Sequence, residues 1–145
     1  FGNTNRLTDT LGTQIYLNNI VVDWSTRKND VVLCYYRTLQ PKTNRTNILI
    51  NSPYTKEGFN GWYLPNSNEL WNIKNSGNTI SINFDWFNYA PFNIDLAVNF
   101  LWTSTVGRSI DAGELYYNLG IVNNSNSNTW NYILVREFTL TELGL

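Results

Sequence analysis

The sequence predicts one small domain in which several short β-strands combine with two short helices. A chain of 145 residues, 42% of them apolar, can close one hydrophobic core but is too short for two ordinary domains. Runs of β-branched and aromatic residues recur along the chain between turn-forming residues. Residues 61–70 join a strand stop, a proline-containing turn and a helix start, so we expect the chain to be organised around this stretch.

In the N-terminal part, residues 15–24 predict two short strands separated by a turn at Asn18 and Asn19. The polar residues 25–30 then lead into a β-rich run at residues 31–37, and together these segments predict a hairpin. Both strands of this hairpin are almost continuously apolar. We therefore expect them to lie in a sheet that is covered on both faces.

Two segments predict helices. Residues 46–51 contain three consecutive apolar residues, although threonine, asparagine and β-branched residues are poor helix formers. Asn66 and Glu69 have the spacing of a capping box, which predicts a second helix over residues 67–75. Leu70 would lie on the buried face of this helix, above the apolar residues that precede the turn.

In the C-terminal half, residues 80–84 alternate between apolar and polar types and predict a strand. The aromatic-rich residues 86–92 predict an ordered loop, because a loop with this many rings must bury some of them. Residues 100–105 predict a further strand. Residues 115–122 and 131–138 predict a long hairpin with a tip made almost entirely of asparagine and serine.

The composition excludes several kinds of chemistry. The chain has no histidine and only one cysteine, so Ser-His and Cys-His nucleophile pairs, zinc sites that need histidine and an internal disulfide are excluded. The cysteine, Cys34, lies in an apolar run and is predicted to be a buried strand thiol. The net charge of −1 supplies no basic face for nucleic acid, and no apolar run is long enough for membrane insertion. Since the sequence does not begin with methionine, we expect a piece of a longer protein.

Three sequence blocks resemble the family named after the C-terminal domain of the collagen-like bacterial adhesin Lcl. The first is Gly-Trp-Tyr-Leu-Pro at residues 61–65, followed by Glu-Leu; the second is Leu-Trp-Thr-Ser-Thr at residues 101–105; the third is Val-Arg-Glu-Phe at residues 135–138. An Arg-Leu-Thr-Asp opening at residues 6–9 is similar to the usual start of the family. The sequence departs from the family pattern at Tyr63, where an arginine is usual, so a salt bridge made by that arginine is absent here.

The resemblance implies a fold and a role. It implies an α+β, C-type-lectin-like domain over residues 1–145, with a twisted antiparallel sheet, two short helices and long loops. Such domains form the C-terminal tips of longer fibrous proteins, among them adhesins and phage tail fibres, and most of them bind without doing chemistry. We therefore expect a receptor-binding or adhesin tip domain that recognises a cell-surface glycan or protein receptor. It would be extracellular, on a virion tail fibre or a bacterial cell-surface fibre, and form a homotrimer through an upstream stalk.

The resemblance also indicates where a ligand would bind. The expected face comprises the loop after Thr105, the outward side chains of residues 115–122 and the Asn/Ser tip. It supplies an aromatic ring, a cation and amides, the usual parts of a glycan site. The candidate ligand-binding residues are Arg108, Tyr116, Asn118, Asn126, Asn128 and Trp130. Two alternatives stay open: the tip is a solvated turn without a ligand, or a shift of one residue exchanges Tyr116 for Tyr117.

The other conspicuous residues are interpreted as scaffold. Trp62 and Trp102 bury large apolar areas, and each needs one partner for its N–H group. Glu69 and Arg136 are candidates for a partly buried ion pair. No metal or cofactor is predicted: the acidic residues are scattered, and Gln40-Pro41-Lys42 places a cation where a C-type lectin would carry a calcium ligand.

Two further functions are considered. A structural cap or subunit-interaction domain of a fibre would use the aromatic residues 86–92 as its contact. A carbohydrate-active enzyme would need a pair of carboxylates, for which Asp85, Asp95 and Asp111 are candidates without a distinguishing spacing. The formylglycine-generating oxidases share the broad fold, but they depend on paired cysteines that this chain lacks.

Overall fold

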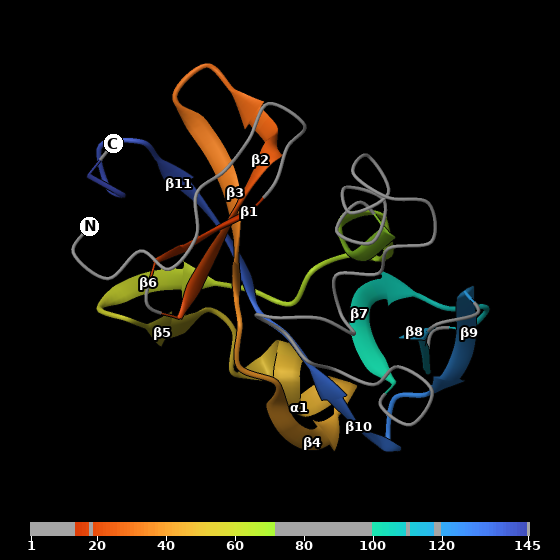
Figure 1. Cartoon of the computed structure of the whole chain (residues 1–145). Helices are drawn as coiled ribbons and strands as arrows, with labels where there is room; N and C mark the ends of the chain where they lie inside the picture. The colour runs from red at the N-terminus through yellow and green to blue at the C-terminus, as the bar shows by residue number, and fades with distance from the viewer. Residues whose placement is uncertain (1–13, 18, 72–99, 110, 118–119, 145) are drawn as a thin grey trace.

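The computed structural model describes residues 14–17, 19–71, 100–109, 111–117 and 120–144 (Figure 1). The predicted strand at residues 80–84, the aromatic loop at residues 86–92 and the end of the second helix lie outside the described residues. So do Asn118, Asp85 and Asp95.

The described part of the chain is a small α+β domain, mostly β-sheet with two short helices. One sheet is antiparallel, in the order β1-β2-β3-β11, and consists of β1 (Gln14–Leu17), β2 (Ile20–Lys28), β3 (Val31–Tyr36) and β11 (Val135–Thr139). The second has the order β4-β10-β7-β8-β9 and consists of β4 (Gln40–Asn44), β10 (Thr129–Tyr132), β7 (Leu101–Val106), β8 (Ala112–Tyr117) and β9 (Gly120–Ser125). Strands β10 and β7 pair in parallel, so the second sheet is mixed. A separate hairpin contains β5 (Tyr54–Lys56) and β6 (Phe59–Trp62).

The predicted N-terminal hairpin is confirmed, and both of its faces are covered. Strands β2 and β3 pair in antiparallel fashion. Val22 and Cys34 belong to one buried apolar cluster, whereas Val21 and Tyr35 belong to another. The connection is shorter than predicted, because β2 continues to Lys28 through an irregular stretch of the ladder. The two clusters form the core on opposite sides of this central hairpin.

Helix α1 (Arg45–Ile50) confirms the first predicted helix and begins one residue earlier. Asn44 caps it, because its side chain accepts a hydrogen bond of 2.7 Å from the backbone N–H of Asn47. Ile48 is fully buried, while Ile50 is 73% exposed. One side of this short helix therefore anchors it to the core.

The predicted capping box is confirmed at the start of the second helix, which is described over residues 67–71. The N–H of Glu69 donates to Oδ1 of Asn66 at 2.8 Å, and the N–H of Asn66 donates to Oε1 of Glu69 at 2.9 Å. Leu70 is fully buried as predicted. Trp62 and Leu64 are buried too, but they lie in the other apolar cluster rather than with Leu70.

The predicted C-terminal hairpin of residues 115–122 and 131–138 is wrong. Strand β8 pairs with β9, so the chain already turns near Gly120, where φ is 136°. Strand β10 then joins β4 and β7, and β11 crosses to the other sheet and pairs with β3. Three of the residues assigned to the Asn/Ser tip are in β9, which leaves a tight turn at residues 126–128.

The two tryptophans interpreted as scaffold are fully buried, and each has one partner for its indole N–H. Trp62 donates to the carbonyl of Lys56 at 3.1 Å, and Trp102 donates to the carbonyl of Thr43 at 3.0 Å. Cys34 is fully buried as predicted. Burial and the nearby Asp23 carboxylate raise the pKa of its thiol far above the ordinary value.

The predicted pair between Glu69 and Arg136 is wrong. Glu69 instead accepts a hydrogen bond of 2.8 Å from the hydroxyl of Tyr63. Arg136 forms an ion pair of 3.0 Å with Glu142. Sequence spacing could not reveal these partners, since Arg136 and Glu69 are far apart in the chain and only the folded structure shows what each side chain contacts.

Candidate functional site

The face expected to bind a ligand is organised by a buried arginine, Arg45, at the start of α1. Arg45 is 4% exposed. Its guanidinium donates to the carbonyls of Thr103 at 2.9 Å and Ser104 at 2.5 Å, and to Oδ1 of Asn126 at 3.2 Å. The backbone N–H of Arg45 also donates to the carbonyl of Asn126 at 3.1 Å. One side chain thus ties the helix, strand β7 and the Asn-rich turn together.

The three partners of this guanidinium are neutral oxygens. Among the described residues, Arg45 makes no ion pair. Removal from water lowers the pKa of Arg45 from its ordinary value. A buried cation without a carboxylate partner is stabilised only by its hydrogen bonds. The same hydrogen bonds fix the positions of the oxygens that accept them.

Gly113 in β8 provides the space that this arginine needs. A Cβ at Gly113 would overlap Cδ and Nε of Arg45. Any larger residue at this position would therefore displace the arginine from the carbonyls it binds. The glycine is required by close approach of a side chain, and not by an unusual backbone angle.

The Asn-rich turn is a network of amides rather than a free loop. The N–H of Asn126 donates to the carbonyl of Asp111 at 2.8 Å. The side-chain amide of Asn128 donates to Oδ1 of Asn124, and the indole Nε1 of Trp130 lies 3.5 Å from the same oxygen. The ring of Trp130 stacks on Phe100, with ring centroids 4.9 Å apart. These contacts order the turn before any ligand arrives.

A shallow hollow of about 290 Å³ lies along β9, the strand that leads into this turn, and the described residues that line it are Arg108, Ile121, Val122 and Asn123. Arg108 and Asn123 are exposed, and Ile121 is 41% exposed. The hollow therefore combines a cation, an amide and an apolar wall. Among the described residues, Arg108 has no ion-pair partner, so its guanidinium is available to an acidic or hydroxyl group.

The predicted site residues fall into three groups. Arg108 and Asn128 are exposed on this face, and Trp130 is half-buried beside the turn. Asn126 is half-buried and engaged by Arg45. Tyr116 is fully buried, so its predicted place on the binding face is wrong. Its ring packs on the half-exposed Trp71, with centroids 6.3 Å apart.

Ile121 and Asn123 were not among the candidate residues, although both lie within the expected face formed by residues 115–122 and the Asn/Ser tip. Exposed and half-buried side chains alternate along β9, and Ile121 and Asn123 are both at exposed positions. One sequence feature could have revealed strand β9: Gly120 is followed by residues of alternating type, which is typical of a turn and the start of a new strand. Arg45 was missed because a buried arginine looks the same in sequence as a surface one.

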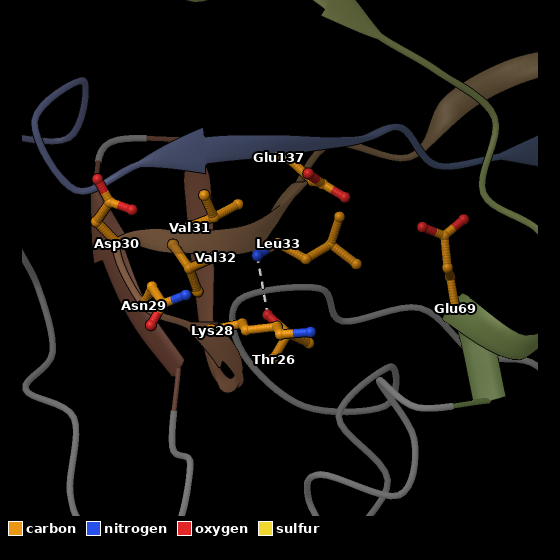
Figure 2. Close-up of a pocket in the computed structure, with 9 residues that line it drawn as sticks. All are labelled: Thr26, Lys28, Asn29, Asp30, Val31, Val32, Leu33, Glu69 and Glu137. Carbon is orange, nitrogen blue, oxygen red and sulfur yellow. Dashed lines mark hydrogen bonds between the residues drawn. The ribbon is translucent and has the colours of Figure 1, made fainter.

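A larger hollow of about 440 Å³ lies beside the β2–β3 hairpin (Figure 2). Figure 2 shows Glu69 and Glu137 on one side of it and Thr26 and Lys28 on another. The hydroxyl of Thr26 accepts a hydrogen bond of 2.8 Å from the N–H of Leu33. This bond connects β2 and β3 where their backbone pairing is irregular. No sequence pattern predicts this hollow, because residues from distant segments of the chain line it.

Three carboxylates, those of Asp30, Glu69 and Glu137, line this hollow and raise the question of glycosidase-like chemistry. A catalytic acid must be free to hold and release a proton. Both oxygens of Glu69 accept hydrogen bonds that build the fold, one from Asn66 and one from Tyr63. Glu69 is thus engaged in holding the fold together.

Within the described ranges, no group of three or more cysteine, aspartate or glutamate side chains could hold a metal ion. Nor does the described part of the chain contain a helix long and apolar enough to cross a membrane.

No protein-family model matches this chain, and no curated protein matches it either.

Proposed function

We propose that this chain is a C-type-lectin-like binding domain that recognises a cell-surface glycan or protein receptor without catalysis. The binding face comprises the hollow lined by Arg108, Ile121, Val122 and Asn123 and the adjacent turn with Asn128 and Trp130. The observation that carries the proposal is the buried Arg45, which ties this turn to strand β7: its side chain donates to Oδ1 of Asn126 and to the carbonyls of Thr103 and Ser104.

Preorganisation is the physical reason to connect this anchor with binding. A ligand that meets an already ordered surface does not have to offset the entropy of ordering it. Asparagine amides both donate and accept, which suits the paired hydroxyls of a sugar. Arg108 adds a charged donor that can hold a carboxylate or a hydroxyl. An exposed, amide-rich face with one cation fits recognition better than chemistry.

The sequence blocks that resemble the adhesin family support the same assignment. Trp62 and Trp102 of the first two blocks are fully buried, and the third block coincides with the start of β11. The resemblance implies that the domain is the C-terminal tip of a longer extracellular fibre, on a virion or a bacterial surface. In a homotrimer, three weak sites on one stalk would raise avidity by about 10²–10⁴.

The test is a binding screen with the chain fused to a trimeric coiled coil. The fusion is applied to glycan arrays and to bacterial and eukaryotic cells, alongside the monomeric chain. The proposal expects saturable binding by the trimer, which weakens when Asn128→Ala is introduced and is much weaker for the monomer. Binding to none of these surfaces, or binding that survives both Asn128→Ala and Trp130→Ala unchanged, would contradict it.

A further inference from the structure

The side chain of Asn123 is packed directly on the backbone of Gly107, at the hollow along β9. A Cβ atom at Gly107 would lie 2.5 Å from Oδ1 of Asn123 and 3.2 Å from its Cγ. Any residue larger than glycine would therefore displace this amide. The N–H of Gly107 also donates to the carbonyl of Ala112 at 2.9 Å, which closes the loop that contains Arg108. The amide and the guanidinium are thus placed next to each other by the backbone at Gly107.

A carboxylate lies on the same face, directly across from this amide. Glu114 in β8 is opposite Asn123 in the register of the two strands. Opposite residues of an antiparallel pair project on the same face of the sheet, with Cβ atoms about 5 Å apart. Glu114 therefore borders the hollow that Arg108 and Asn123 line.

Glu114 is half-buried, and its Oε2 atom is buried. Among the residues that the structure describes, no donor lies within hydrogen-bond distance of this oxygen. A buried carboxylate oxygen is unfavourable without a donor, so a ligand that supplies one would gain from the contact.

We propose that this hollow takes a sugar residue that carries a carboxylate and a neighbouring hydroxyl group. The guanidinium of Arg108 and the amide of Asn123 donate to the sugar carboxylate, and the hydroxyl donates to Oε2 of Glu114. The side chain of Ile121, which is 41% exposed, packs on the apolar face of the sugar ring. This assignment rests on the proposed function, and it names the class of ligand that the proposed site binds.

The two opposite charges at the hollow select against other glycans. A neutral sugar offers no counter-charge to Arg108. A polysulfated chain brings several negative charges close to Glu114, which repels them. A sugar with a single carboxylate and free hydroxyls satisfies both side chains at once.

The first test applies the trimeric fusion to a glycan array on which each acidic glycan is printed beside its carboxyl methyl ester and its neutral parent. Sialyllactose and a galacturonic acid trisaccharide are two such acids. At least one free acid should bind at least about tenfold more tightly than its ester, because the ester has lost the charge that Arg108 recognises.

Three results would overturn the assignment: only neutral glycans or no glycans bind, the esters bind as tightly as the acids, or sulfated glycans without a carboxylate bind equally well. If the fusion still binds cells in any of these cases, the proposed function stands and only the ligand class is wrong. If it binds neither cells nor glycans, both fail.

The second test measures affinity for the tightest-binding acidic glycan together with urea denaturation. Glu114→Gln should weaken binding at least about fivefold without lowering the urea midpoint, because the amide removes an uncompensated buried charge. Gly107→Ala should weaken binding by displacing Asn123, so it should have no further effect in the Asn123→Ala background. The control is Glu137→Gln, an exposed acid of the larger hollow, which should leave the affinity unchanged.

Full affinity in Glu114→Gln, or an equal loss in Glu137→Gln, would contradict a role for Glu114 in binding. A loss of affinity in Glu114→Gln that is accompanied by a lower urea midpoint would show that its role is structural. Additive losses from Gly107→Ala and Asn123→Ala would show that Gly107 does not act through the amide.

Discussion

The guanidinium of Arg45 donates a hydrogen bond of 3.2 Å to Oδ1 of Asn126, 81 residues further along the chain. The same side chain binds two carbonyls of strand β7. This contact links the first helix to the turn that borders the candidate site. It explains how a segment of polar residues acquires a fixed shape without a hydrophobic core of its own.

Replacing Arg45 should therefore lower the free energy of unfolding by more than an ordinary surface substitution does. Arg45→Ala leaves two carbonyls and one amide oxygen without their donor, and we expect a loss of about 3 kcal/mol in the free energy of unfolding. Arg45→Lys should recover part of the loss, because an ammonium group keeps the charge but cannot reach all three oxygens. Urea denaturation measures both, with the exposed Lys42→Ala in β4 as control. A cost below about 0.5 kcal/mol for Arg45→Ala would show that the anchor is not formed.

The space beside Gly113 makes a second prediction. Gly113→Ala should destabilise the protein by about 2 kcal/mol, because the new methyl group displaces Arg45 from its partners. In the double variant with Arg45→Ala the methyl group meets no arginine, so the two costs should not add. The measurement is a double-mutant cycle by urea denaturation. Additive costs would mean that Gly113 acts through something other than the arginine.

The contacts of Arg136 make a third prediction. Its guanidinium lies 4.3 Å from the ring centroid of Phe138 and donates a 2.6 Å hydrogen bond to the carbonyl of Asn60. Arg136→Ala should lower the free energy of unfolding by about 1–2 kcal/mol. Glu142→Gln removes only the charge of the half-exposed ion partner and should lower it by less than about 1 kcal/mol. A double-mutant cycle between Arg136→Ala and Glu69→Gln should give a coupling below about 0.5 kcal/mol. A larger coupling would restore the pair predicted from the sequence.

Burial of Cys34 and Tyr35 makes the fold sensitive to alkaline pH. Burial raises the pKa of both groups, and it raises the pKa of Tyr132 to about 12. At neutral pH these groups are protonated in both states and have no effect. Above about pH 9 the unfolded chain ionises first, so the free energy of unfolding should fall by about 1.4 kcal/mol per pH unit for each such group.

Urea denaturation between pH 8 and pH 11 checks this dependence. The decline should begin near the ordinary pKa of a thiol and steepen above about pH 10, where the tyrosines of the unfolded chain ionise. The variant Cys34→Val should remove the first part of the decline and keep the second. A constant free energy of unfolding through pH 11 would contradict the burial of these groups.

The parts of the fold that the sequence predicted are those decided by local chemistry. The capping box of Asn66 and Glu69 depends on four consecutive residues. The burial of the β2–β3 hairpin follows from its continuous apolar runs. The pairing of the C-terminal strands was predicted wrongly because β10 pairs with β4 and β7, which are distant from it in the sequence. No local pattern distinguishes it from a simple hairpin.

The candidate site shows the same division. Arg108 and Asn128 were placed on the exposed face because loops of polar residues lie at the surface. Tyr116 was misplaced because its outward or inward direction depends on a strand register that the sequence does not define. Arg45 could not be recognised at all, since its burial depends on space left by Gly113 in a distant strand.

Cell binding by the trimeric fusion tests the central claim, that recognition takes place at the face beside the Arg45-held turn. Two exposed cations make a matched pair: Arg108 lines the hollow at this face, and Lys28 lines the larger hollow beside the β2–β3 hairpin. The account predicts that Arg108→Ala weakens the apparent affinity at least about tenfold, while Lys28→Ala leaves it unchanged. Full affinity in Arg108→Ala together with a loss in Lys28→Ala would contradict the account and move the site to the other hollow.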